Sequence, residues 1–162
     1  MKGLTMIINT FIATSTLTIS STSFTENGVI PIKYTCDGDN LSPALHFQDL
    51  PKETVSIAII LHDPDASKAG GFTHWIAWNI NPTIDIPENY KGGEQGTNDA
   101  QKQGYIGPCP PSGTHHYHFK IYALDAILTL DKNVNKTTLE KAMKGHILAK
   151  GELVGLYKKT TI

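Results

Sequence analysis

The sequence predicts a single domain dominated by β-strands, which form a sandwich or a barrel and are accompanied by one or two short helices. Two observations lead to this fold class. Short apolar runs recur along the chain, and clusters of Gly, Pro, Asn and Asp, which are typical of turns, separate them. In addition, 162 residues are enough for one domain to bury a core without metal or disulfide cross-links.

Five segments have the composition and length of strands: residues 16–20, 55–62, 72–80, 115–124 and 153–157. The first is rich in Thr and Ile, the second is an apolar run, the third carries both tryptophans, and the fourth alternates before it turns apolar. Short strands with frequent turns favour an all-β fold over alternating strand–helix units.

One helix is predicted near the C-terminus. Thr137 and Glu140 have the spacing of a capping box, in which two side chains satisfy backbone amides at a helix start. Five further residues recur at helical spacing and would form one apolar stripe: Leu139, Ala142, Met143, His146 and Ile147. We therefore expect His146 to be packed or hydrogen-bonded in the core rather than to bind a ligand.

The amino-acid composition limits the classes of partner that this protein can bind. The net charge of −1 gives no reason to expect a nucleic-acid or membrane-surface partner. All 14 basic residues are lysines, so the bidentate guanidinium grip on phosphate is absent from this chain. An anion site here must use histidine, lysine, hydroxyl groups and backbone amides instead.

Residues 1–15 combine Lys2 with apolar residues, as a signal peptide does, but polar residues interrupt the stretch and no small-x-small cleavage site follows. We therefore predict an N-terminal extension over 1–15, a single domain over 16–162, and a cytoplasmic protein. The alternative is a periplasmic or secreted protein, if the extension acts as a signal. No run approaches the roughly 18 apolar residues that stable membrane insertion needs.

Two polar segments fall near strand ends. The pair Asp63 and Asp65 flanks Pro64 directly after an apolar run, which is a good turn but also a position where sheets present functional groups. His74 lies inside the strand 72–80. On a regular strand it would share a face with Ile76, Trp78 and Ile80. Both faces have the composition of buried surfaces, so His74 must either be a satisfied core residue or line a cavity.

Strand alternation distinguishes among three neighbouring histidines. From residue 115, one face receives His115, Tyr117, Phe119 and Ile121, and the other receives His116, His118 and Lys120. The composition of the first face predicts burial and that of the other face predicts contact with solvent, so alternation selects His115 beside Tyr117 as the pocket candidate. The preceding proline-rich loop is stiff, because each proline fixes φ, and a stiff loop suits a preformed wall.

Together, Asp63, His74, His115 and Tyr117 would make a small polar pocket. Imidazole and phenol groups can donate to the oxygens of an anion. A nearby carboxylate would orient a histidine and favour its cationic form, and it could also bind an ammonium group. A ligand that carries phosphate and amine therefore suits this set of side chains.

Several blocks of the sequence resemble the phosphatidylethanolamine-binding protein family, which includes the Raf kinase inhibitor-like proteins. Blocks typical of the whole family are Asp63-Pro64-Asp65-Ala66, Thr73-His74-Trp75, Gly107-Pro108-x-Pro110-Pro111-x-Gly113-x-His115-x-Tyr117 and Tyr122-Ala123-Leu124-Asp125. Blocks that match the bacterial and archaeal branch are Tyr34-Thr35-Cys36-Asp37-Gly38, Ser42-Pro43, Gly145-His146-Ile147-Leu148-Ala149 and Gly155-Leu156-Tyr157. The resemblance extends from about residue 17 to 157.

This resemblance implies an antiparallel β-sandwich with a small anion-binding cavity and no cofactor. The family's ligand-binding residues fall on Asp63, His74, Pro108, His115 and Tyr117. It also implies a non-enzymatic protein that binds a phosphate-like anion, a phospholipid head group or a phosphorylated partner. Family members are associated with kinase regulation or protease inhibition, and bacterial members often form homodimers.

Three departures from the family pattern bear on these expectations. Ser67 stands where proline is common, and His116 stands where arginine is frequent, which weakens the attraction for an anion at neutral pH. The chain ends five residues after Tyr157, where animal members continue into a helix beside the pocket. The last departure argues against kinase regulation through that helix.

Three other hypotheses remain open from the sequence. The first is a metal-dependent hydrolase in which Asp63, His74 and His115 hold zinc or iron, although no ligand-spaced motif such as HExxH occurs. The second is a protease inhibitor that acts through residues 91–103. The third is nucleophilic catalysis by Cys109, for which the sequence shows no activating base. The two cysteines fit either free thiols or one long-range disulfide.

Overall fold

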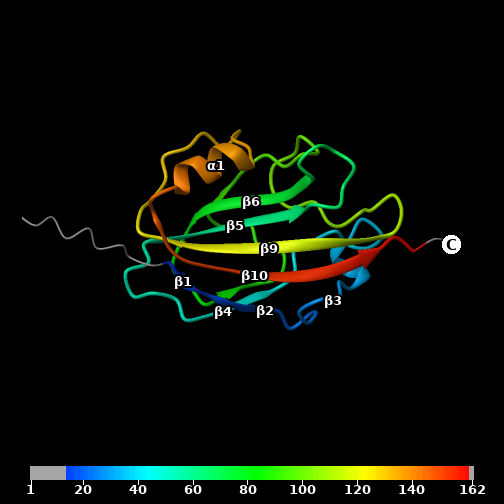
Figure 1. Ribbon diagram of the computed structural model, residues 1–162, viewed down its shortest axis with the longest axis horizontal. Coiled ribbons are helices and arrows are strands. Elements are labelled where there is room, and N and C mark those ends of the chain that lie inside the picture. The colour runs from blue at the N-terminus through cyan, green and yellow to red at the C-terminus, as the bar shows by residue number, and fades with distance from the viewer. Residues whose placement is uncertain (1–13, 161–162) are drawn as a thin grey trace, which may run out of the picture.

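The computed structural model describes residues 14–160, and strands dominate this part of the chain (Figure 1). A seven-stranded sheet has the order β1-β10-β9-β5-β6-β8, and β3 also pairs with β10. Its strands are β1 Ser15–Thr16, β3 Gly28–Val29, β5 Ser56–Asp63, β6 Phe72–Ile80, β8 Glu94–Gln95, β9 Thr114–Leu124 and β10 Ile147–Lys158. The predicted β-dominated fold is confirmed.

A smaller sheet of three strands has the order β2-β4-β7. Its strands are β2 Thr18–Ser20, β4 Leu45–Gln48 and β7 Asp85–Ile86. Most pairings in both sheets are antiparallel, but β1 and β3 pair with β10 in parallel, so the larger sheet is mixed rather than purely antiparallel. The predicted strand 153–157 is only the second half of β10.

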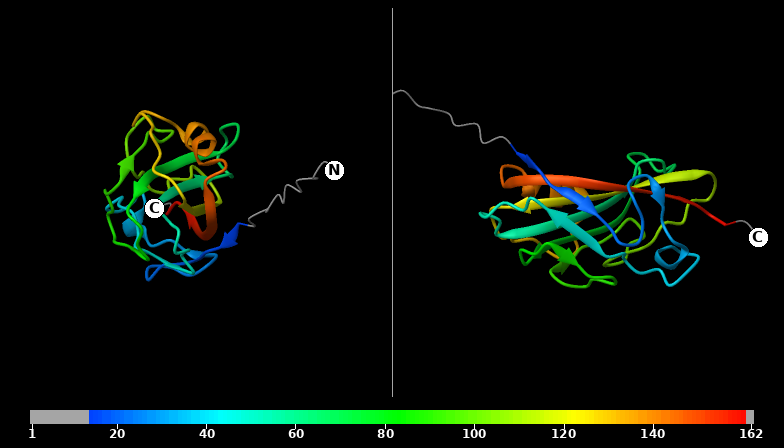
Figure 2. Two further views of the ribbon diagram at one scale, coloured as in Figure 1. Left: turned by 90° about the vertical axis from the view of Figure 1, so that its left-hand side faces the viewer. Right: turned by 90° about the horizontal axis from the view of Figure 1, so that it is seen from below.

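Two hydrophobic clusters hold the layers together. The larger one lies between the two sheets and contains, among others, Trp75 and Phe119 of the larger sheet and Phe47 of the smaller one. The second cluster lies on the other side of the larger sheet, under helix α1 (Lys136–Met143), which contributes Leu139 and Met143. Figures 1 and 2 show α1 on one side of the larger sheet and the smaller sheet on the other.

The helix starts earlier than its sequence pattern predicts. Asn135 is the N-cap, and its side chain accepts a hydrogen bond from the amide of Thr138. The predicted capping box therefore does not form, and Glu140 instead pairs with Lys136 one turn back. The helix ends at Met143, before Gly145 with φ of 85°. His146 consequently lies outside the helix, where it is exposed and bonds Asp125.

The two cysteines form one disulfide, Cys36–Cys109, with the Cα atoms 5.4 Å apart. It joins the segment after the 3₁₀ helix Ile32–Tyr34 to the loop before β9. Of the predicted extension, residues 1–13 lie outside the described residues, and the boundary after residue 15 falls inside β1. Over residues 14–160, no helix is both long and apolar enough to cross a membrane.

Candidate functional site

A cavity of about 230 Å³ opens where β5 ends and β9 begins. Four of the five predicted ligand-binding residues line it, namely Asp63, His74, His115 and Tyr117. The remaining wall comes from loop residues and apolar side chains: Ala66, Ser67, Lys68, Phe72, Ile106, Gly107, Cys109, Pro110 and Pro111. The structure thus brings together side chains that lie more than 50 positions apart in the sequence.

Asp63 and His115 form the buried polar base of this pocket. Because β5 and β9 are antiparallel neighbours, the last residue of one lies beside the first residues of the other. The Nδ1 atom of His115 lies 2.6 Å from Oδ2 of Asp63, and the two side chains are only 11% and 3% exposed. The other oxygen, Oδ1, accepts the amide of Asp65 at 2.8 Å. The turn therefore fixes the carboxylate, and the carboxylate fixes the imidazole.

His74 reaches the pocket because β6 is irregular. Leu61 pairs with Trp75 and His62 pairs with Thr73, so His74 is an extra residue, as in a β-bulge. Its ring lies beside Tyr117, which belongs to the cluster between the sheets. The predicted shared face with Ile76 and Trp78 is therefore wrong, because these two pack under α1.

The same face prediction also fails for Ile80. Asn79 adopts a left-handed φ of 53°, and the pairing with β5 shifts there as well. Ile80 consequently packs between the sheets, together with Trp75 and Ala77. Two irregularities on one strand thus overturn simple alternation at both of its ends.

Burial sets the protonation state of His74. Its Nδ1 lies 2.9 Å from the carbonyl oxygen of Ile106, which can only accept, so Nδ1 carries the proton. Burial lowers the pKa of His74, while the carbonyl of Ile106 and the charge of Asp63 partly oppose this shift. The ring is therefore neutral near pH 7, and Nε2 is the nitrogen available to a ligand.

Tyr117 has the least satisfied polar group of the pocket. The side chain is fully buried, and its hydroxyl has no hydrogen-bond partner among residues 14–160. Its ring lies 5.3 Å from that of His74 and 6.4 Å from that of His115, measured between centroids. Burial, followed by the charge of Asp63, raises the pKa of Tyr117, and the nearby backbone of Cys109 only partly opposes this shift, so the group remains a protonated donor.

Pro108 lies outside the lining of the cavity, although the sequence resemblance placed it in the site. It is buried in the loop behind the wall, where its carbonyl accepts the amide of Cys36 at 3.0 Å. The next residue back, Gly107, donates its amide to Asn40, and any Cβ on it would lie 2.4 Å from the carbonyl oxygen of Tyr34. These contacts position the loop rather than the ligand.

The outward-facing histidines are separated from the pocket, as alternation predicted. The amide and the ring of His116 both bond Oδ2 of Asp65 at 2.7 Å, and these bonds hold the pKa of that carboxyl below its usual range. His118 pairs with Glu152 on the outer face of β9 and β10 at 3.2 Å. Of the three neighbouring histidines, only His115 lines the cavity.

Two of the alternative chemistries find little support in this arrangement. Over residues 14–160, no group of three or more His, Cys, Asp and Glu side chains is placed to hold a metal ion. Within the pocket, Asp63 and His115 bond to each other. Cys109 is part of a disulfide and so has no thiolate with which to attack a substrate.

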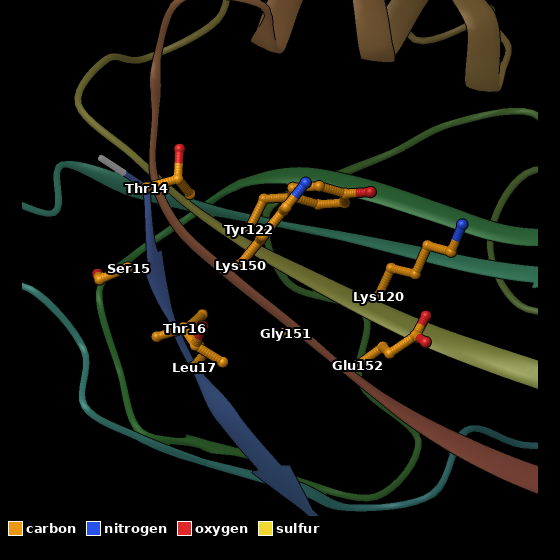
Figure 3. A pocket seen from close by; sticks show the side chains of 9 residues that line it. All are labelled: Thr14, Ser15, Thr16, Leu17, Lys120, Tyr122, Lys150, Gly151 and Glu152. Carbon is orange, nitrogen blue, oxygen red and sulfur yellow. The ribbon is translucent and has the colours of Figure 1, made fainter. Parts of the chain in front are cut away.

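A larger hollow of about 560 Å³ lies on the outer face of the seven-stranded sheet (Figure 3). It is bordered by β1 and by outward side chains of β9 and β10, namely Lys120, Tyr122, Lys150 and Glu152. Lys150 and Glu152 are exposed, and Lys120 and Tyr122 are half-buried. Since no polar group of its described lining is deeply buried, this hollow has the character of open surface.

Comparison with known proteins identifies a family model and several relatives that match most of this chain. The model of the phosphatidylethanolamine-binding protein family matches residues 20–158. A UPF0098 protein of Pyrococcus horikoshii is 50% identical over 150 residues, which cover 86% of this chain and 75% of that protein. A UPF0098 protein of Chlamydia trachomatis is 40% identical over 147 residues, which cover 87% and 98%.

Two solved structures share the fold. A phosphatidylethanolamine-binding protein homologue from Chlamydia trachomatis aligns with a TM-score of 0.85 and 38% identity, over 91% of this chain and all of the other. YbcL of E. coli, described as a member of the mammalian family, aligns with a TM-score of 0.83 and 27% identity, over 90% of this chain and all of the other. Both matches span most of the domain that carries the pocket.

Proposed function

The chain belongs to the phosphatidylethanolamine-binding protein family, as the sequence predicted, and we propose that its pocket binds small phosphate-like anions without catalysing a reaction. The ligand would be a free phosphate-like anion, a phospholipid head group or a phosphorylated partner. Asp63, His74, His115 and Tyr117 would bind it, and Pro108 would act behind them by holding the loop.

The observation that carries the proposal is the buried hydroxyl of Tyr117, which lacks an acceptor among the described residues and whose ring lies beside those of both pocket histidines. A buried donor without an acceptor costs about 1–3 kcal/mol, so a ligand that accepts this hydrogen bond would recover that free energy. Both histidines hold their Nδ1 on a fixed oxygen, which leaves Nε2 to face a ligand. The hydroxyl of Tyr117 can donate to a phosphate oxygen. Nε2 of a neutral histidine instead accepts from a protonated phosphate oxygen, and it donates only after the ring takes up a proton.

The charge of the pocket favours a ligand with both signs. Asp63 is a buried carboxylate, and Lys68 at the rim is already paired with Asp99 at 3.0 Å. Among the described residues, the lining therefore offers no free cation to neutralise a doubly charged anion, apart from any imidazole that takes up a proton. A phosphate with a nearby ammonium, as in phosphoethanolamine, would place its positive group near Asp63 and its oxygens near the hydroxyl of Tyr117, and its net charge would be lower than that of phosphate alone.

The test is a titration of inorganic phosphate and of phosphoethanolamine, followed by NMR of the histidine rings. We expect saturable shifts of the His74 and His115 ring signals, with tighter binding of phosphoethanolamine. The matched variants are His115→Ala, which removes an inward ring, and His118→Ala, which removes an outward ring from the same strand. We expect His115→Ala to abolish the shifts at His74 and His118→Ala to leave them unchanged.

The proposal would be wrong if the folded wild-type protein gave no shift at millimolar ligand. It would also be wrong if His118→Ala weakened binding as much as His115→Ala does, because the anion would then bind the outer face. Conversion of the ligand during the titration, visible as new phosphorus signals, would contradict the non-catalytic part of the proposal.

A further inference from the structure

The disulfide Cys36–Cys109 forms part of the wall of the candidate pocket. Cys109 lines the cavity, and so do Pro110 and Pro111, which follow it directly. Both cysteine residues are exposed, so a reductant in solution can reach the bond. The cross-link therefore combines two properties: it contacts the ligand site, and it is open to solvent.

Upstream of Cys109, the loop is held without the help of sulfur. The hydroxyl of Tyr105 donates to the carbonyl of Tyr34 at 2.6 Å, and the amide of Gly107 donates to Asn40 at 2.7 Å. In addition, the carbonyl of Pro108 accepts the amide of Cys36. None of these hydrogen bonds involves a sulfur atom, so we expect them, and the fold around the loop, to survive reduction of the disulfide.

Downstream of Cys109, such anchors are missing. Within the described chain, residues 110–113 take part in no backbone hydrogen bond outside the strands. Pro110 and Pro111 have no amide proton to donate, and Gly113 has a left-handed φ of 70° with open space around it. Strand β9 begins only at Thr114. Cys109 is therefore the last fixed point before the segment that covers His115 and Tyr117.

We propose that the Cys36–Cys109 disulfide makes ligand binding sensitive to redox state, an inference that rests on the proposed anion-binding function. In the oxidised protein the cross-link holds Pro110 and Pro111 against the cavity. In the reduced protein this wall is free to move, and the binding-competent arrangement is occupied for only part of the time. Apparent affinity falls in proportion to that occupancy.

The chemistry is thiol–disulfide exchange with a dithiol, either a small molecule or a dithiol protein. A thiolate of the dithiol attacks one sulfur of the cross-link, which breaks the S–S bond and forms a mixed disulfide. The other thiol of the reductant then closes its own disulfide and releases the remaining cysteine. Two electrons and two protons pass to the Cys36–Cys109 pair, and the dithiol is oxidised to its disulfide.

The experiment measures the dissociation constant of inorganic phosphate for the oxidised protein and for protein reduced with dithiothreitol, with far-UV circular dichroism as a check on the fold. We expect the reduced protein to stay folded and to bind at least about fivefold more weakly, the lower end of typical coupling between sites. The variant Cys36→Ser/Cys109→Ser should bind as weakly as the reduced protein, and dithiothreitol should not change it.

A reciprocal measurement tests the same coupling. Saturating phosphate must make the disulfide harder to reduce by the factor by which reduction weakens phosphate binding. Equal affinities of the folded oxidised and reduced proteins would overturn the redox proposal and leave the anion site standing. Unfolding on reduction would also overturn it, because the bond would then hold the whole domain. An oxidised protein that binds no phosphate would instead refute the proposed function.

Discussion

Strand β9 borders two hollows of different kinds. Its inward side chains His115 and Tyr117 line the pocket between the layers, whereas its outward side chains Lys120 and Tyr122 border the hollow on the outer face (Figure 3). The outer hollow is the larger, at about 560 Å³ against about 230 Å³. Volume alone would therefore select a different region from the one that we propose as the binding site.

The difference between the regions lies in how their polar atoms are held. In the pocket, Asp63 and His115 are buried and fixed by mutual contact, so the protein has already met the cost of orienting them. On the outer face, Lys150 and Glu152 are exposed, so water and salt screen their charges. Our proposal of a binding site therefore rests on buried, oriented polar groups rather than on the volume of the cavity.

The largest expected difference concerns the two carboxylate–histidine pairs that β9 forms, one in each region. Asp63→Asn removes the buried charge that holds His115, and we expect the free energy of unfolding to fall by about 2 kcal/mol. Glu152→Gln removes the exposed partner of His118, and we expect a change within about 0.5 kcal/mol. Urea denaturation of both variants measures this difference. Equal losses would mean that burial does not distinguish the two pairs.

The next effect compares two tyrosines of the same strand. Tyr117→Phe removes the buried hydroxyl without a partner among the described residues, and we expect phosphate affinity to fall about tenfold, as for the loss of one hydrogen bond to a charged group. Tyr122→Phe removes the hydroxyl at the outer hollow, and we expect no change in affinity. Calorimetric titration of phosphate into both variants measures this. A greater loss of phosphate affinity in Tyr122→Phe than in Tyr117→Phe would mean that the anion binds at the outer face.

The regular strand could be predicted from sequence, and the irregular one could not. Strand β9 runs without a break from Thr114 to Leu124, and its first residues pair with β10 in regular register, so alternation placed His115 and Tyr117 inward correctly. Strand β6 carries two register shifts, and alternation therefore misplaced both His74 and Ile80. No residue typical of turns marks the register shift at His74. Near the other shift, Asn79 is a weak signal, because asparagine tolerates a left-handed φ.

The residues that form the walls of the pocket were harder to predict from the sequence than those of its polar base. Ile106, Pro110 and Pro111 carry no chemistry that distinguishes them in a sequence, and they approach Asp63 only through the loop path. The pairing of Cys36 with Cys109 depends in the same way on a contact between loops 73 positions apart. Family blocks located the loop and assigned Pro108 to ligand binding, and the structure places this residue behind the wall of the cavity.

The smallest expected effect is the pH dependence of stability that the buried ring of His74 contributes. Burial lowers the pKa of His74 in the folded protein, so below the ordinary value of about 6.5 the unfolded chain binds a proton that the folded protein excludes. The stability should therefore fall as the pH drops below about 6.5. His62, whose pKa burial and Lys136 also lower, adds to this fall in the same direction.

Chemical denaturation at pH values from about 7.5 to about 5, across the range of histidine titration, measures this dependence. His74→Gln keeps an amide that can donate to the carbonyl of Ile106 but removes the titrating ring, so we expect a shallower fall of stability with acid. If the dependence of stability on pH were unchanged in His74→Gln, the buried ring would take up its proton as readily in the folded protein as in the unfolded chain. That result is incompatible with a desolvated imidazole in the pocket.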